Sequence, residues 1–556
     1  HLLLIRNLAS VEGNLDESIK NVLAKHFRSL WRIAELHDQI EQISKSFAGQ
    51  SGWPSGWMAI GATLRFDSNS MTKEHKKRLE ALRADIAARD LDSQMELLVF
   101  SNSHDYFGLD ELNEEGKLVK WGHEKAQELA EELGILVVKE HYSYLSRQLR
   151  RIFTTRTSNR HLLYFGRGVA HGARDSDKVW NDIVINLERL EISEVNSAFI
   201  QGFIGCVNDN DSKRANLYLD KLLENIKLNE IFPLVQLSCP LDKFAIDRLV
   251  VTLKNGSSPS WMYSNMASGR RHEAIPDSDL ITILDLLWLR PNGNNAVIEI
   301  LTMRFHDLDR QEKYSPSTDF LEKSREFLLK HDYGREQQNH GGHDYSLAQI
   351  AKVCFSQVEG TERAKVLFNK LAKGISTSKI FAFDYEELLA TLVKVQPVHA
   401  LNIFLSDENV LRQLTTSHLS SEISPFSYLA PDEALKWCKE VPNCRFNTLA
   451  SAITPYEKVG DKYKITELAK ALISHSPKSG LAIEAFVETV ISTSMGSSFS
   501  STIEKKAEIF NELLSCEKSD VKESAEKALS KLEKKIQEER INEELWSRKQ
   551  EERFEW

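Results

Sequence analysis

The sequence lacks the features by which several classes of protein are recognised. It has six cysteines in 556 residues, and no two of them form a CxxC pair. Disulfide frameworks and zinc sites usually need closely spaced cysteines, so we expect free thiols in a reducing compartment. No apolar run approaches the length of a membrane span, and the N-terminus shows no signal-peptide pattern. These absences predict a cytoplasmic protein with no membrane segment, metal or other cofactor.

The chain also lacks the patterns of charge and glycine that mark proteins that bind nucleotides or nucleic acids. Acidic residues outnumber basic ones by 81 to 71, which gives a net charge of −10. No global field therefore draws nucleic acid to the chain, and we do not expect nucleic acid as a partner. The stretch LYFGRGVAHGARDSD fits neither GxxxxGK[ST] nor GxGxxG after a strand. We expect it to be a glycine-rich interruption between helices.

Helical periodicity is what the sequence has in abundance. Hydrophobic residues make up 41% and charged residues 27%, so most of the chain should fold, and it is too long for one compact core. In Leu388 to Leu405, two apolar stripes at helical spacing are separated by Gln396 and Pro397. This segment predicts two helices joined by a tight turn.

Similar helix pairs recur along the chain. In the second helix of several pairs, a small residue is followed by apolar residues four and seven positions later, which places all three on one face. The sets are Ala215, Leu219, Leu222; Ala296, Ile300, Met303; Ala364, Phe368, Leu371; and Ala434, Cys438, Val441. Strand signals are sparse throughout. We therefore predict an all-α fold, an extended α-solenoid of irregular helix-turn-helix repeats of the TPR or HEAT kind.

Three parts are expected along the chain. Residues 1–195 form an N-terminal helical region with Gly- and Trp-rich loops, and residues 196–518 form the repeat array. Residues 519–556 are dominated by Lys, Glu, Gln and Arg, with a narrow apolar stripe that fades after Ile536. This composition is typical of a capping helix followed by a charged tail.

Helical arrays usually bind other macromolecules, so we sought exposed anchors. The polar segment GSSPSWMYSNMASGRRHE holds Trp261, Tyr263, Arg270 and Arg271. Aromatic residues beside arginine are typical of binding anchors, whereas ordinary loop packing would use the same residues structurally. These four residues are the candidate binding site for another protein.

A nuclease or phosphohydrolase in the N-terminal half is the alternative. Metal-dependent phosphohydrolases use His-Asp pairs, and His343-Asp344 follows His340 in NHGGHDYS, which we expect to be a polar loop. Arg156 and His161 have the spacing used by helical ribonucleases of the HEPN class. A surrounding cluster could contact phosphate or form a solvated face: Arg147, Arg150, Arg151, Arg156 and Arg160.

Several segments together resemble a known family. They are GWPSGWMAIGATLRFD, YFGRGVAHGARDSDKVWND, ASGRRHEAIPDSDLITILDLLWLRPNGNNAVIEILTMRF and EELWSRKQEERFEW. This texture resembles the C-terminal helical regions of bacterial STAND-type antiviral NTPases. In that family an effector and a nucleotide-binding module precede a helical sensor, which recognises a phage protein and drives oligomerisation.

The resemblance implies a division of labour. This chain would be the sensor, its partner would be another protein, such as one that a phage encodes, and any oligomer would form through an NTPase module outside it. ATPase and effector activity would lie in residues not present here, so this chain itself would not be an enzyme. The start at His1, without an initiator Met, agrees with that expectation.

Overall fold

Two compact units make up the protein. The computed structural model describes residues 17–100, 106–113, 117–156, 159–306, 308, 314–334, 340–414, 423–492 and 498–554. The first unit comprises His1–Ile275 and Leu289–Pro291, and the second comprises Pro276–Trp288 and Asn292–Trp556. Their boundary lies inside the segment 196–518, which the sequence suggested to be one array. The division into three parts stays a prediction.

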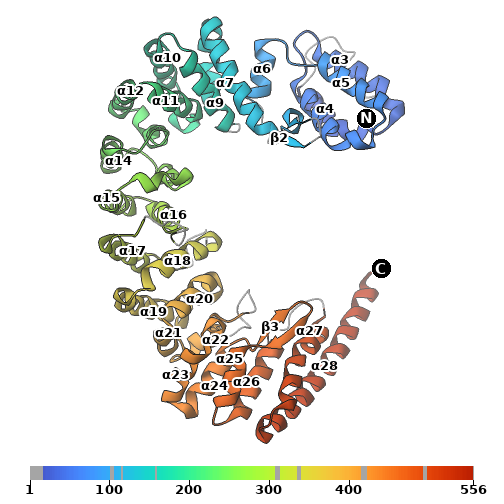
Figure 1. Cartoon of the computed structure of the whole chain (residues 1–556), viewed down its shortest axis with the longest axis vertical. Helices are drawn as coiled ribbons and strands as arrows, with labels where there is room; N and C mark the ends of the chain where they lie inside the picture. Colours follow the sequence, from blue (N-terminus) through green and yellow to red (C-terminus); the bar gives the residue numbers. More distant parts are fainter. Residues whose placement is uncertain are drawn as a thin grey trace. The chain divides into compact units, whose positions relative to one another are not determined.

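The first unit is built from helices and one short hairpin (Figure 1). Its α-helices are α2 (Glu17–Trp31), α3 (His37–Ala48), α4 (Pro54–Asp67), α5 (Lys73–Asp85), α6 (Leu91–Leu98), α7 (Gly122–Glu140), α8 (Tyr142–Thr154), α9 (Asn159–Gly172), α10 (Ser176–Glu188), α11 (Ala198–Asn210), α12 (Ser212–Glu224), α13 (Phe232–Gln236) and α14 (Lys243–Asn255). Its 3-10 helices are η1 (Ala34–Leu36), η2 (Ser68–Ser70), η3 (Phe107–Leu109), η4 (Ile192–Glu194), η5 (Leu228–Ile231), η6 (Ser260–Met266) and η7 (Ser268–Ala274). Strands β1 (Glu111–Leu112) and β2 (Leu118–Lys120) pair in antiparallel fashion.

The second unit continues with the same kind of element. Its α-helices are α15 (Asp277–Trp288), α16 (Gly293–Phe305), α17 (Thr318–Lys330), α18 (His340–Phe355), α19 (Thr361–Ser376), α20 (Glu386–Val395), α21 (Pro397–Phe404), α22 (Glu408–Leu414), α23 (Pro431–Glu440), α24 (Pro442–Ala452), α25 (Glu467–His475), α26 (Ser479–Ser492), α27 (Phe499–Ala507) and α28 (Ser519–Phe554). Its 3-10 helices include η9 (Val358–Gly360), η10 (Ala382–Tyr385), η12 (Pro425–Tyr428) and η13 (Glu508–Ser515). Strands β3 (Tyr456–Val459) and β4 (Lys462–Ile465) form a second antiparallel hairpin.

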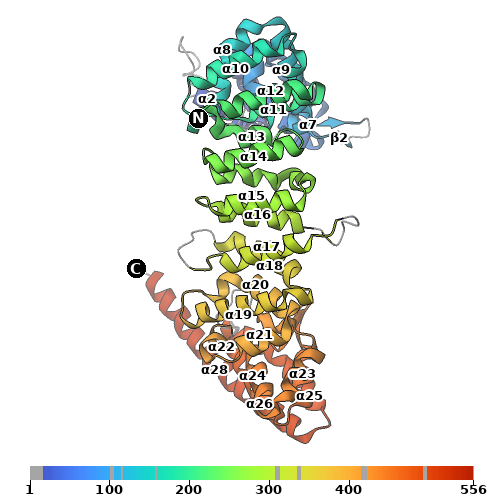
Figure 2. The same ribbon diagram turned by 90° about the vertical axis from the view of Figure 1, so that its left-hand side faces the viewer.

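Helices of the second unit form two parallel ladders of contacts. Along one ladder, α15 packs on α17, α17 on α19, α19 on α21, α21 on α23, and α23 on α25. Along the other, α16 packs on α18 and α18 on α20, and further on α24 packs on α26 and α26 on α28. Figure 2 shows these layers stacked one after another. Because helices along both ladders contact the equivalent helix of the next pair, the predicted all-α solenoid is confirmed.

The hydrogen bonds reveal a repeat length that the sequence did not make plain. Side chains repeatedly bond to groups 39 to 43 residues away, as a ladder of similar layers requires. Examples are Arg28 with Asp67, Tyr142 with Asp182, Tyr218 with Asp177, Ser317 with Asp277, Gln396 with Phe355, and Ser500 with Glu543. A period of about 40 residues is typical of HEAT and armadillo repeats and longer than the TPR period.

One prediction about glycine was wrong. The glycine-rich stretch expected to interrupt the helices lies largely inside α9, and its glycines face neighbouring helices. A Cβ on Gly166 would lie 2.1 Å from the carbonyl oxygen of Phe199 in α11, and one on Gly168 would lie 2.0 Å from that of Glu131 in α7. Glycine is needed there because the helix backbones nearly touch. The glycines are thus structurally required, but they lie within a helix and do not interrupt it.

Three further local expectations differ from the structure. NHGGHDYS was expected to be a loop, but α18 begins at His340. Val441 was placed on the apolar face of a helix, but α23 ends at Glu440 and Val441 is 45% exposed. The hairpin of β3 and β4 was not expected either, because strand signals are sparse throughout the sequence.

A buried carboxylate joins α2 to α4. Asp67 accepts hydrogen bonds from Arg28 at 2.7 and 2.9 Å and from Arg32 at 3.1 Å, and its side chain is 9% exposed. The hydrogen bonds from Arg28 lower the pKa of Asp67 to about 2. A carboxyl group with a lowered pKa stabilises the fold above its ordinary pKa, and this contribution is lost as the pH falls toward 2.

We therefore expect Asp67→Asn to lower the melting temperature by about 2 °C at pH 7, the scale of a partly exposed ion pair. The difference between variant and wild type should shrink below pH 4 and vanish only below pH 2, where wild-type Asp67 is also protonated. Thermal unfolding of both chains across this pH range measures it. A difference that stays constant with pH would show that the charge of Asp67 is not the cause.

No helix in the part of the chain that the structure describes is long and apolar enough to cross a membrane.

Candidate functional site

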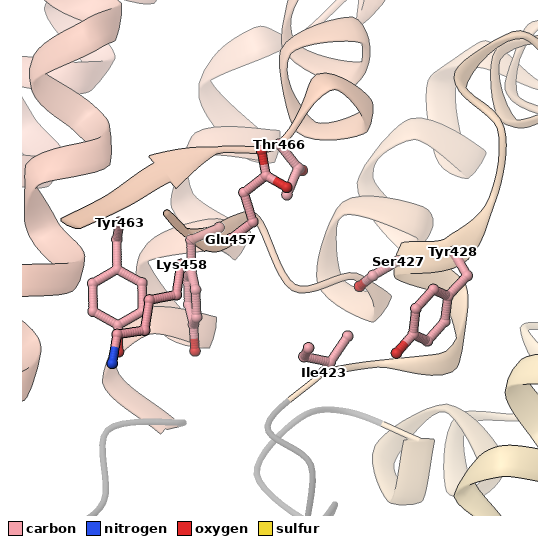
Figure 3. A pocket seen from close by; sticks show the side chains of 8 residues that line it. Ile423, Ser427, Tyr428, Glu457, Lys458, Tyr463 and Thr466 are labelled. Atoms are coloured by element: carbon pink, nitrogen blue, oxygen red, sulfur yellow. The ribbon is translucent and has the colours of Figure 1, made fainter. Parts of the chain in front are cut away.

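A pocket in the second unit lies between η12 and the β3–β4 hairpin (Figure 3). Its volume is about 510 Å³. The lining residues are Ile423, Ser427, Tyr428, Tyr456, Glu457, Lys458, Tyr463 and Thr466. Figure 3 shows the hairpin side chains on one side of the pocket and Ser427 and Tyr428 on the other.

Local sequence explains how the two walls form. Gly460 has φ 65°, which favours glycine, and Gly460-Asp461 makes the two-residue turn that pairs Val459 with Lys462. Pro425 starts η12, and the side chain of Ser424 caps it by accepting a hydrogen bond from the Phe426 backbone at 3.2 Å. The walls are therefore held by tight turns.

Three tyrosines give the pocket its apolar surface. The rings of Tyr456 and Tyr463 meet edge to face with centroids 5.4 Å apart. The buried Lys506 lies close to both rings, with its ammonium nitrogen 4.7 Å from the Tyr456 ring centroid and 6.0 Å from that of Tyr463. Tyr428 on the other wall is 45% exposed, and Lys394 lies 4.0 Å from its ring centroid. Tyr428 thus presents a positioned aromatic surface to solvent.

The polar groups of the lining are suited to binding. The hydroxyl of Ser427 accepts a hydrogen bond from the Thr454 backbone at 2.8 Å, and that of Thr466 accepts one from the Ala469 backbone at 3.2 Å. Each hydroxyl still carries a hydrogen that it can donate. Glu457 and Lys458 are exposed and add one charge of each sign. The described residues of the lining include no histidine or cysteine that could act as base or nucleophile.

Sequence reasoning missed this site, although a signal was available. Tyr456 to Ile465 reads YEKVGDKYKI, in which Gly-Asp separates two runs of four residues. A two-residue turn of this kind between short runs with aromatic and β-branched residues is a hairpin signal. The dominance of helical periodicity on both sides concealed it.

The four predicted binding residues lie in η6 and η7 of the first unit. Trp261 is 60% exposed, as expected of an anchor. The expectation for Tyr263 was wrong, because its side chain is fully buried and its hydroxyl donates a hydrogen bond to Thr252 Oγ1 at 2.8 Å. The aromatic ring of Tyr263 therefore packs in the core and cannot be offered to a partner.

The side chains of the two arginines interact with residues of η6 and η7. Arg270 is exposed with a left-handed backbone, φ 59°, and pairs with Glu273 at 2.5 Å. Arg271 donates to the backbone oxygens of Asn265 and Ser268 at 3.2 and 3.3 Å, and burial lowers its pKa. A binding role for Trp261 and the two arginines stays a prediction.

The geometry does not support the HEPN-type alternative. His161 lies in α9 and is 4% exposed, and its Nδ1 is 2.9 Å from the hydroxyl of Tyr106, which is also buried. Arg156 follows α8 and is exposed. A base and a phosphate-binding cation must reach the same substrate atoms, and a buried His161 cannot.

The His-Asp pair is also used structurally. Both carboxylate oxygens of Asp344 accept backbone N–H groups at the start of α20, from Glu387 at 2.8 Å and Leu388 at 2.9 Å. Burial raises the pKa of Asp344 to about 6 despite these bonds. The side chain of His340 lies outside the described residues. Within those residues, no three His, Cys, Asp or Glu side chains group as metal ligands would.

The arginine cluster of α8 and α9 is a solvated face for most of its members. All five arginines predicted there are exposed. Arg151 is paired with Glu96 at 2.5 Å and its guanidinium carbon lies 3.9 Å from the centroid of the Phe100 ring.

Comparison with known proteins gives no family. No protein-family model matches the sequence, and no curated protein matches it significantly. Solved structures align along the chain at low similarity. One is a structure of APUM23 with its insert region deleted, whose name also gives the sequence GGAAUUGACGG. It is 13% identical over 99% of this chain and 98% of its own, with a TM-score of 0.26. A circular tandem repeat protein is 11% identical over 98% of both chains, with a TM-score of 0.20. A chain of the SYS-1/POP-1 complex is 10% identical over 95% of this chain and 90% of its own, with a TM-score of 0.24. At these scores the likenesses carry no argument about function.

Proposed function

We propose that this chain is a protein-binding helical-repeat module, and that it holds a loop or peptide of another protein in the pocket between η12 and the β3–β4 hairpin. The observation that carries the proposal is the lining itself, in which tyrosines, hydroxyl donors and one charge of each sign converge on about 510 Å³. Tyrosine is enriched among residues that dominate binding energy, and hydroxyl groups suit a peptide backbone.

Charge favours a protein over a nucleic acid as the occupant. Tyrosine rings can stack on bases as well as on side chains, so the rings alone do not decide. Glu457 stands exposed at the lining and would repel a phosphate backbone, and the whole chain carries a net charge of −10. A peptide with both apolar and charged side chains meets neither obstacle.

A narrower proposal concerns the larger protein. We infer that the chain is the ligand-recognition part of a bacterial anti-phage NTPase, whose ATPase, effector and oligomerisation functions lie in other residues. The support is the sequence texture of four segments, among them Gly52–Asp67 and Ala267–Phe305. The ligand would then be a phage-encoded protein.

Pocket variants test the binding proposal directly. The purified chain is used to capture proteins from phage-infected and uninfected bacterial lysates, and affinity for a captured protein is then measured. We expect Tyr428→Ala to weaken binding about tenfold or more, because it removes an exposed aromatic anchor. Val459→Ala is the matched control, since Val459 is 48% exposed on the same hairpin and does not line the pocket.

The outcomes separate the broad proposal from the narrow one. Equal affinity of wild type and Tyr428→Ala for every captured protein would refute the pocket as the binding site. Capture of a host protein from both lysates, bound through Tyr428, would support the protein-binding module. It would refute the proposal that the ligand is a phage-encoded protein. Recovery of RNA alone would refute protein binding.

A further inference from the structure

Helix α28 has one packed face along its first half. Its buried side chains are Val521, Ala525, Ala528, Leu532 and Ile536, and they face α26, α27 and η13. Glu543 makes the last anchor, where its carboxylate accepts hydrogen bonds from the Ser500 backbone at 2.8 Å and the Ser500 hydroxyl at 2.7 Å. Figures 1 and 2 both show the C-terminal end of α28 extending past α27.

The opposite face of α28 carries two apolar side chains that are more than half exposed among the described residues. Ile541 is 59% exposed and Leu545 is 51% exposed. Ile541 follows the buried Leu532 by nine residues, which at about 100° each places the two about 180° apart around the helix. Ile541 and Leu545 are one helical turn apart, so they form a single small stripe on the outer face.

Charged residues flank this stripe in a symmetric order. Glu538 precedes Ile541 by three residues, and Arg548 follows Leu545 by three. Both are exposed on the same side of the helix as the apolar pair. Glu538 pairs with Lys535 of its own helix at 3.8 Å, and such an exposed pair is weak and easily exchanged. Along the outer face the order is therefore an acidic residue, two apolar residues and a basic residue: Glu538, Ile541, Leu545 and Arg548.

We propose that this outer face of α28 binds the same face of a second copy of the chain in antiparallel orientation. The two-fold axis would cross the outer face at the height of residue 543 along the helix. Ile541 then meets Leu545 of the second copy, and Glu538 meets Arg548 of the second copy. Every contact occurs twice, as a self-complementary two-fold interface requires. A parallel pairing would place Glu538 against Glu538, which opposes it. The interface does not depend on the pocket or on its ligand.

Sedimentation velocity of the whole chain over a range of concentrations tests the proposal. The wild type should show a reversible dimer. Glu538→Arg and Arg548→Glu should each weaken dimerisation about tenfold or more, because each sets like charges opposite one another. The double variant with both changes should restore it. Ser547→Glu is the control, since it adds an acidic charge next to Arg548 on a different face and should leave the dimer unchanged.

Three results would overturn the proposal. They are a wild-type chain that stays monomeric at every concentration, a double variant that fails to recover the dimer, and a control that weakens it as much as Arg548→Glu. Hydrogen exchange of the α28 amides in each variant checks that this helix stays folded. None of these substitutions touches the pocket, so capture of a partner through Tyr428 succeeds or fails independently.

Discussion

Gly202→Ala should destabilise the first unit by about 3 kcal/mol, the upper end of the usual range for overpacking. A Cβ at this position of α11 would lie 1.8 Å from the carbonyl oxygen of Leu163 in α9. A backbone oxygen inside a helix cannot rotate away, so the two helices must separate. Their separation would loosen the close packing of α7, α9 and α11 that Gly166 and Gly168 also allow.

Hydrogen exchange of amides in α9 and α11 is the appropriate measurement, because it reports the local stability of these two helices. Gly205→Ala in the same helix is the control. Its added Cβ would lie 3.2 Å from the Ser238 carbonyl oxygen, which requires only a small shift, and alanine favours a helix by about 1 kcal/mol. If both variants exchange alike, close backbone approach does not determine stability here.

Asp277→Ala should destabilise the start of the second unit by about 3–5 kcal/mol, the cost of removing one member of a buried ion pair. Asp277 accepts hydrogen bonds from Arg304 at 2.9 Å, from the Tyr314 hydroxyl at 2.9 Å and from the Ser317 backbone at 2.8 Å. Arg304 is only 4% exposed. Burial by itself would raise the pKa of Asp277, but these hydrogen bonds together lower it.

Thermal unfolding and hydrogen exchange of α15 to α17 measure this effect. Asp285→Ala on the same helix removes a carboxylate that is 44% exposed and pairs with Lys323, so it should cost less than 1 kcal/mol. Equal losses for the two variants would mean that burial of the Arg304 charge is not what makes Asp277 important.

Much of the fold could be predicted because each helix shows its buried face in the sequence. In α20 and α21, Leu388, Leu392, Ala400 and Phe404 are all fully buried, and a tight turn at Gln396 joins the two helices. The errors arise where a residue type serves two purposes. Glycine marks a loop when its φ is positive, and in α9 it marks contact between helices, which only the tertiary structure distinguishes.

The candidate site was harder to predict for a physical reason. Its tyrosines come from η12 and from a hairpin about 30 residues later, and no periodic pattern connects them. Tyr263 shows the converse problem, because a polar sequence neighbourhood suggested exposure whereas the ring is buried. Local composition reports the average environment of a segment, and single aromatic side chains depart from it.

The ladder of contacts has a consequence for how the protein is made. Because the bonds between layers join residues separated by 39 to 43 positions, each helix finds its partners within the next repeat to leave the ribosome. Contacts of short sequence separation form quickly, and folding can follow synthesis from one layer to the next. Each completed layer then offers an apolar face to the next, as α26 does to α28.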